Sequence, residues 1–361
     1  MKKVVCIHLF NDFSGSPLVL STAIKGFRKN NIPVDLITCG GREGFLSHLD
    51  VVERHFFYRW LPNKYLRLVV FMLSQLQIFL MLLRYWRQDV VIYINTLLPF
   101  GAALAGKLMG KRVVYHVHET SVNPPSLKSF LKGMAKKCAT EGIYVSKYLQ
   151  EAEGLEGVPG HVIYNALSEE FVAKAQQYLM DCKKVESLNV LMLCSLKDYK
   201  GVREFVRLAE VVPAANFELV LNADHQSIEA YFAGQSLPEN LILFPVQSNV
   251  HPFYQRADLV LNLSHPEQWV ETFGMTLLEA MLYGVPSIVP PVGGPVEVVQ
   301  DGLNGYQIDQ RELKRIAEHI QNLIDQPELL FELSENSRRH VKQFSVKNMV
   351  NEIHKVALKA A

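Results

Sequence analysis

The feature that most constrains the fold is a repeated alternation of short apolar runs with helical segments. The chain opens with an apolar run at residues 3–9, a polar loop, a helical pattern at 18–27 and a second apolar run at 34–38. Short β-branched runs that end at polar residues are typical of buried strands. A helix between two such strands makes them parallel, so the opening predicts an α/β protein built on parallel sheets.

The alternation occurs in two halves of similar size, and 361 residues are sufficient for two domains. We therefore predict two Rossmann-like, doubly wound domains that face each other across a cleft. The predicted boundaries are residues 1–168 for the N-terminal domain, 169–186 for the connection and 187–344 for the second domain. The later strands are expected at residues 89–94, 112–119, 141–146, 161–165, 188–194, 217–222, 241–244, 257–263 and 286–290. Further helices are expected at 101–109, 202–211, 276–282 and from 310 onward.

Composition excludes several classes of protein. A net charge of +1 gives no reason to expect a nucleic-acid polymer as partner. The five cysteines have no paired spacing, which predicts free, mostly buried thiols in a reducing compartment. The apolar run at residues 3–9 is short and is followed by Asn11 and Asp12, unlike a signal peptide. We therefore expect a cytoplasmic protein, and a periplasmic binding protein is disfavoured.

Residues 56–86 form the most apolar region, and two interpretations of it remain open. In the first, residues 69–83 form a helix packed in an α/β core, too short for the roughly 20 residues of a spanning helix and interrupted by Ser74, Gln75 and Gln77. In the second, an amphipathic helix makes peripheral contact with the inner face of a membrane. Basic residues flank or punctuate the region, namely Arg59, Lys64, Arg67, Arg84 and Arg87.

Residues 271–301 carry the densest pattern of carboxylates and glycines. Glu271 and Glu279 are separated by seven residues, and the loop from Phe273 to Thr276 leads into a predicted helix. Amides at a helix N-terminus lack intrahelical partners and can bind phosphate, and Gly274 allows a close backbone approach. Glu279, about one turn into the same helix, can accept hydrogen bonds from a ribose. Together these parts suit a nucleotide-sugar donor.

Other candidate residues follow predicted strands, where parallel sheets bind their ligands. Lys200 could meet a diphosphate, and Gly15, in a Ser-Gly-Ser loop, could meet a phosphate or a sugar edge. Glu271 could reach a sugar hydroxyl or the reacting centre. Each also has an ordinary structural explanation: a solvated helix Glu, a Lys-Gly turn, a loop glycine, or a histidine at a strand end for His118. Their combination in one order favours a donor site.

This combination resembles the family 4 glycosyltransferases (glycosyl transferases group 1), retaining enzymes with the two-Rossmann-domain GT-B architecture. The resemblance is densest from Asn240 to Asp309. It rests on Glu271, Phe273, Gly274, Glu279, Gly284, Pro286, Gly293, Gly294, Glu297 and Gly305.

The resemblance implies retaining, hexosyl-type transfer from a nucleotide sugar to a glycan or lipid-linked glycan, in polysaccharide or glycolipid assembly. It implies catalytic roles for His118 and Glu271, and a C-terminal helix, residues 345–361, that packs back on the first domain. No cofactor or required metal is expected, because no Asp-x-Asp motif is present. The implied nucleotide-sugar-binding residues are Gly15, Lys200, Phe273, Gly274, Met275, Thr276 and Glu279.

Two departures from the family pattern bear on function. Ser195 stands where the family usually has a diphosphate-binding Arg, unless Lys197 supplies that charge, and the family's Gly-Gly loop is Ser14-Gly15-Ser16 here. Two alternatives therefore stay open. One is a catalytically silent nucleotide-sugar-binding protein, and the other is a different GT-B enzyme such as an epimerase.

Overall fold

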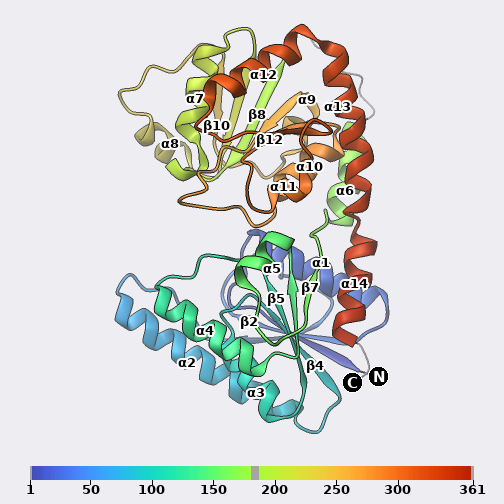
Figure 1. The fold of residues 1–361 in the computed structure, drawn as a ribbon. Coiled ribbons are helices and arrows are strands. Elements are labelled where there is room, and N and C mark those ends of the chain that lie inside the picture. Colours follow the sequence, from blue (N-terminus) through green and yellow to red (C-terminus); the bar gives the residue numbers. More distant parts are fainter. Residues whose placement is uncertain (1, 180–186, 359–361) are drawn as a thin grey trace. The chain divides into compact units, whose positions relative to one another are not determined.

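A computed structural model describes residues 2–179 and 187–358. The chain divides into two compact units, each an α/β fold with its own parallel sheet (Figure 1). Unit 1 comprises the chain up to Ala166 together with the segment from Val346, and unit 2 is Leu167–Ser345. The prediction of two Rossmann-like domains is confirmed.

Unit 1 contains a seven-stranded parallel sheet in the order β3-β2-β1-β4-β5-β6-β7. Its strands are β1 Lys3–Ile7, β2 Val34–Cys39, β3 Val52–Phe56, β4 Val90–Asn95, β5 Arg112–Val117, β6 Glu141–Tyr144 and β7 Gly160–Val162. Its helices are α1 Gly15–Lys29, α2 Lys64–Leu82, η1 Leu83–Tyr85, α3 Phe100–Leu108, α4 Pro125–Cys138, α5 Lys147–Glu153 and α14 Val346–Leu358. The strand order reverses at β1, which pairs with both β2 and β4, so β1 and β4 form the switch point where such sheets bind ligands.

Helix α14 is part of the core of unit 1. It packs on α1, and Met349, Val350 and Ile353 are buried in the same cluster as Ile24 and Phe27 of that helix. The Arg112 guanidinium also donates to the Val356 carbonyl at 2.9 Å. The last helix is therefore a structural element of the unit that the first residues begin.

Unit 2 contains a six-stranded parallel sheet in the order β10-β9-β8-β11-β12-β13. Its strands are β8 Asn189–Cys194, β9 Asn216–Leu221, β10 Leu241–Phe244, β11 Leu259–Leu261, β12 Ser287–Val289 and β13 Gly305–Gln307. Its helices are α6 Glu169–Tyr178, η2 Asp198–Lys200, α7 Val202–Val211, α8 His225–Tyr231, α9 His251–Arg256, α10 Met275–Leu282, α11 Pro295–Val298, α12 Leu313–Asp325, α13 Pro327–His340 and η3 Val341–Gln343. Here β8 is the switch strand, between β9 and β11.

Several elements differ from the sequence-based expectation. Strand β3 was not predicted, because at the sheet edge it carries polar, largely exposed residues and no apolar run. Strand β7 covers only three residues where five were expected. The predicted connection contains α6, which clusters with unit 2, and its remainder at 180–186 lies outside the described residues. Of the cysteines, Cys6, Cys39 and Cys138 are free and buried and Cys194 is free and half-buried; Cys182 is outside the description.

Helix α2 is longer than predicted and is not a core helix. It begins at Lys64, where the Asn63 side chain caps the amides of Tyr65 and Leu66, and it runs to Leu82. Only one face of it is buried. Within the described residues, the helical stretch Lys64–Tyr85 alone is long and apolar enough to cross a membrane by length and composition. The first interpretation of this region is therefore correct for one face only.

Candidate active site

In unit 2, Lys200 and Glu271 lie together although 71 positions separate them. The Lys200 ammonium donates to Glu271 Oε2 at 2.7 Å and lies 5.0 Å from the centre of the Trp269 ring. The Trp269 indole N–H is 3.4 Å from the same oxygen, and Tyr199 stacks on the indole. The predicted diphosphate cation and the predicted sugar-side carboxylate are thus paired, and Trp269, which the sequence did not single out, orients both.

The Lys-Gly turn holds Lys200 at this position. Gly201 has a φ of 78°, in the left-handed region that favours glycine. A Cβ here would be 2.3 Å from the Leu263 carbonyl oxygen, so the turn lies directly against the chain that leaves β11. Because position 201 has no side chain, the turn can pack against Leu263, and this packing places Lys200 close to the carboxyl end of the sheet.

A second close approach fixes the loop that carries Glu271. The Gly294 amide donates to the Glu271 carbonyl at 2.9 Å. A Cβ on Gly294 would be 2.1 Å from the Thr272 carbonyl oxygen. Phe273 is buried and packs edge-on against Phe344. The Gly-Gly run and the buried Phe273 side chain therefore hold the loop rigidly.

Helix α10 begins at Met275, one residue earlier than predicted, and Gly274 is its N-cap with a φ of 103°. No side chain caps this end, and the first turn contains no acidic residue. The first amides of a helix have no intrahelical partner and carry the positive end of the helix dipole. Those at Met275 and Thr276, two and three residues after Phe273, therefore suit a phosphate group.

Glu279 lies on the next turn of α10 and is half-buried. Burial raises the pKa of Glu279 from its ordinary value of 4.5 to about 7, while the hydrogen bond from Tyr254 acts to lower it. The Tyr254 hydroxyl donates to Glu279 Oε2 at 2.6 Å. Tyr254 itself is fully buried and stacks on Tyr283. The carboxyl is therefore rigidly held, and its desolvation makes a hydroxyl donor, such as those of a ribose, a favourable partner.

In unit 1, His118 follows β5 at the same sheet edge as Asn95, the last residue of β4. His118 Nε2 lies 2.7 Å from Asn95 Oδ1, and the Asn95 amide nitrogen donates to the Ser16 carbonyl at 3.1 Å. This orientation of the amide assigns the proton to Nε2 and leaves Nδ1 as an acceptor. The Glu119 carboxylate accepts hydrogen bonds from the backbone amides of Leu97 and His118. These bonds tie together the segments that follow β4 and β5, next to the imidazole.

Two further histidines surround His118. His116 is fully buried, its ring centre lies 4.2 Å from that of His118, and its Nδ1 is hydrogen-bonded to Tyr93. His8 follows β1 and contacts Asn95. Burial lowers the pKa of His118 well below its usual range, and the neighbouring His116 and His8 lower it further. His118 is therefore a neutral hydrogen-bonding group. Asn95, a polar residue at a predicted strand end, is the positioning residue that sequence analysis missed.

Gly15 is the first residue of α1, and it is exposed. Nothing lies within 4 Å of the position that a Cβ would occupy there. The Ser14 hydroxyl is directed to the Asp12 carboxylate at 2.5 Å and does not cap the helix. The first amides of α1 are consequently accessible to an anionic or polar ligand.

At Ser195 an uncharged side chain follows β8, and the nearest cationic residues along the chain are Lys197 and Lys200. Ser195 directly follows that strand and is half-buried, and its carbonyl accepts the Lys197 amide at 2.8 Å. The Lys197 side chain is exposed. Lys200 is the cation that the structure holds against a predicted site residue.

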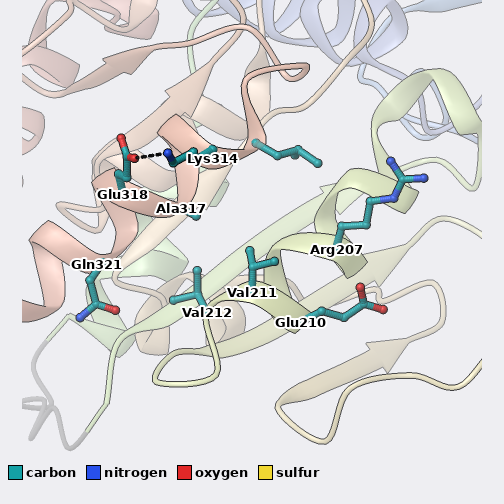
Figure 2. Close-up of a pocket in the computed structure, with 9 residues that line it drawn as sticks. Arg207, Glu210, Val211, Val212, Lys314, Ala317, Glu318 and Gln321 are labelled. Atoms are coloured by element: carbon teal, nitrogen blue, oxygen red, sulfur yellow. Dashed lines mark ion pairs between the residues drawn. The ribbon is translucent and has the colours of Figure 1, made fainter.

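A surface pocket of about 660 Å³ lies between α7 and α12, and Arg207, Val212 and Lys314 are among the residues that line it (Figure 2). None of the predicted site residues lines it, and its Lys314 and Glu318 form an ion pair along one helix. Among the described residues, no group of three or more His, Cys, Asp and Glu side chains is arranged to hold a metal ion. The predicted site residues lie in two groups, which we call half-sites: Lys200, Glu271 and Glu279 belong to unit 2, and Gly15 and His118 belong to unit 1.

Comparison with known families tests this interpretation. The family described as Glycosyltransferase Family 4 matches residues 13–171, and Glycosyl transferases group 1 matches residues 181–340. The chain belongs to the group 1 glycosyltransferases of family 4. Among curated relatives, N-acetyl-alpha-D-glucosaminyl L-malate synthase of Bacillus anthracis is 25% identical over 280 residues, 73% of this chain and 72% of its own. The resemblance that the sequence predicted is confirmed.

Solved structures of similar fold agree. The crystal structure of Anabaena HepE in complex with UDP and glucose has a TM-score of 0.78 at 20% identity and covers 99% of this chain and 100% of its own. Sucrose-phosphate synthase from Thermosynechococcus elongatus has a TM-score of 0.74 at 16% identity, with 99% and 98% covered. At these identities the likeness establishes the fold, which is that of GT-B glycosyltransferases.

Proposed function

We propose that this glycosyltransferase moves a hexose, with retention, from a nucleotide-diphosphate sugar to a glycan or lipid-linked glycan in polysaccharide or glycolipid assembly. The observation that carries the proposal is the Lys200–Glu271 pair at 2.7 Å, three residues before the uncapped N-terminus of α10. A similar protein, HepE, is described in complex with UDP-glucose. We further propose a cytoplasmic site of action and no requirement for a divalent metal.

The pair explains how a donor could be bound and activated. An incoming diphosphate competes with Glu271 for the Lys200 ammonium and takes further hydrogen bonds from the α10 amides. Glu271, released from Lys200, can then accept a hydrogen bond from a hydroxyl of the donor sugar. As the glycosidic bond breaks, negative charge grows on the leaving diphosphate, so Lys200 stabilises the transition state more than the ground state.

The remaining residues have separate roles in the proposal. Glu279, fixed by Tyr254, accepts the ribose hydroxyls. His118, neutral and fixed by Asn95, offers a hydrogen-bonding group to the transferred sugar. We propose the front-face route, in which the leaving diphosphate helps to deprotonate the acceptor, because the resemblance implies it.

The first experiment identifies the donor. A thermal-shift screen with UDP-, GDP-, ADP- and dTDP-sugars should raise the melting temperature with one nucleotide class, because a ligand that binds only the folded state stabilises it. Lys200→Ala should reduce that shift, and the exposed Lys197→Ala should preserve it. A donor shift that is the same in Lys200→Ala as in wild type would contradict the assignment.

The second experiment separates catalysis from binding. Glu271→Ala and His118→Ala should each abolish transfer to acceptor glycans, and proton NMR of the wild-type product should show the donor's anomeric configuration. EDTA should leave the rate unchanged. Donor binding without any product would favour the silent binding protein that Ser195 suggests, and donor conversion without acceptor would favour an epimerase.

A further inference from the structure

Helix α2 carries apolar side chains on its exposed face as well as on its buried face. Its buried positions, Phe71, Ser74, Gln75, Ile78 and Leu82, recur at the spacing of one helical face. Two of these five are polar, although this is the face turned toward the protein. The opposite face is apolar, so the pattern cannot be explained by the core of unit 1.

The polar groups on the inner face are satisfied within the protein. The Gln75 side-chain oxygen accepts the Gly101 amide at 3.0 Å, and the Ser74 hydroxyl donates to the Phe71 carbonyl at 2.6 Å. Gln77, at the margin, accepts the Phe57 amide at 2.8 Å. Specific hydrogen bonds therefore fix which face of α2 is turned toward the protein.

The outer face forms a continuous apolar stripe. Its members are large hydrophobic side chains that are 45–69% exposed, namely Tyr65, Leu66, Leu68, Val69, Met72, Leu73, Leu76 and Leu80. From Tyr65 to Leu80 the stripe extends about 22 Å along the helix. Helix α3, which contacts both α2 and α4, also carries the exposed Leu104 and Leu108. Soluble monomers rarely expose a contiguous apolar patch of this size without a binding role.

Charge and aromatic residues at the two ends indicate the kind of partner. Exposed Trp60 and Trp86 flank the helix, and the Arg67 guanidinium lies over the Trp60 ring at 5.1 Å. The exposed basic side chains near these ends are Arg59, Lys64, Arg84 and Arg87. No acidic residue occurs between His55 and Gln88. Apolar centre, interfacial tryptophans and a purely basic rim together complement an anionic lipid surface.

We propose that the α2 stripe docks unit 1 on an anionic bilayer, with α2 lying in the plane of the headgroups. The inner face excludes a spanning arrangement, because Ser74 and Gln75 remain bonded within a folded α/β unit. In-plane binding buries the apolar stripe while the basic ends contact lipid phosphates. The inference extends the proposed function. Its one link to that function is the suggestion that the acceptor is lipid-linked.

The test is co-flotation of the full-length protein with vesicles. Wild type should float with vesicles of phosphatidylcholine and phosphatidylglycerol, and less with phosphatidylcholine alone, and high salt should weaken binding. The double substitution Leu73→Glu and Leu76→Glu should lower the bound fraction by at least about tenfold, since charge on the apolar face opposes insertion. The milder pair Leu73→Gln and Leu76→Gln should lower it in the same direction.

A matched control is Phe331→Glu on α13, a 69% exposed apolar residue of unit 2, which should float like wild type. Circular dichroism and the donor-induced thermal shift should be the same in all variants, which keeps failure of docking distinct from failure of the donor site. Equal flotation of wild type and the Leu73/Leu76 variants would overturn the proposal. So would a lipid-free dimer of wild type that those variants dissociate, because the stripe would then be a protein interface.

Discussion

We predict that the ionised Glu279 carboxyl lowers the free energy of unfolding of the protein, although the proposed function needs it to bind the ribose. The substitution Glu279→Gln tests this prediction. Glutamine keeps the size of the side chain and an oxygen that can accept from Tyr254, but it carries no charge. Burial raises the pKa of Glu279 from 4.5 to about 7. The wild-type folded state therefore has to desolvate a charge at high pH that the variant never carries.

The sign and size of the effect follow from the raised pKa. Below pH 4.5 the carboxyl is protonated in both folded and unfolded states, so it adds no pH-dependent cost. As the pH rises from 4.5 toward 7, the Glu279 carboxyl ionises in the unfolded chain but stays protonated in the folded protein. The free energy of unfolding therefore falls across this pH range. At about 1.4 kcal/mol per pKa unit the full cost is on the order of 3 kcal/mol, an upper limit for a half-buried group.

The assay is urea unfolding at pH values from about 5 to about 8, monitored by tryptophan fluorescence. Trp60 and Trp86 are replaced by phenylalanine in every variant, so that the signal comes from Trp269 in unit 2. The stability gain of Glu279→Gln over its parent should be small at pH 5 and approach its limit at pH 8. Tyr254→Phe should shift the window to higher pH, because its hydrogen bond lowers the pKa. The same Glu279→Gln variant should bind donor more weakly. A gain that does not change with pH would refute the reasoning.

Three other substitutions test the geometry of the two half-sites. Lys200→Ala should weaken donor binding by about 10- to 100-fold in calorimetry, the range for a charge-assisted contact, and an effect equal to that of Lys197→Ala would contradict it. Asn95→Ala should reduce kcat by roughly tenfold with little change in donor affinity, because it frees the His118 ring; a loss confined to affinity would argue against positioning. Gly294→Ala should destabilise unit 2 by about 1–3 kcal/mol in urea, because its methyl group meets the Thr272 carbonyl, and wild-type stability would disprove that contact.

The sequence predicted the central strands well because they are buried on both faces and form continuous apolar runs. Helix Val202–Val211 and strand Leu241–Phe244 match their predicted bounds. The exposed edge strand Val52–Phe56 has no such run, and its sequence could not be distinguished from a loop. The apolar content of α2 was visible, but which face of it packs inward was not.

The candidate site shows a similar limit. Glu271, Gly274 and Glu279 lie at a fixed spacing in one segment, so a local pattern was enough to select them. The pairing of Lys200 with Glu271 depends on how two loops from different strands meet, which no local pattern records. The orientation of Asn95 toward His118 is likewise set by the register of two neighbouring strands.

The position of α14 has a consequence for biosynthesis. Unit 1 begins with the first strand, yet its core includes Met349, Val350 and Ile353, which leave the ribosome only after all of unit 2. Until then, α1 exposes the apolar surface that α14 will cover. Although domains usually fold in the order of their synthesis, here the unit that starts first is completed last. A nascent chain arrested before Val346 should therefore protect unit 2 from protease while unit 1 is still being cleaved.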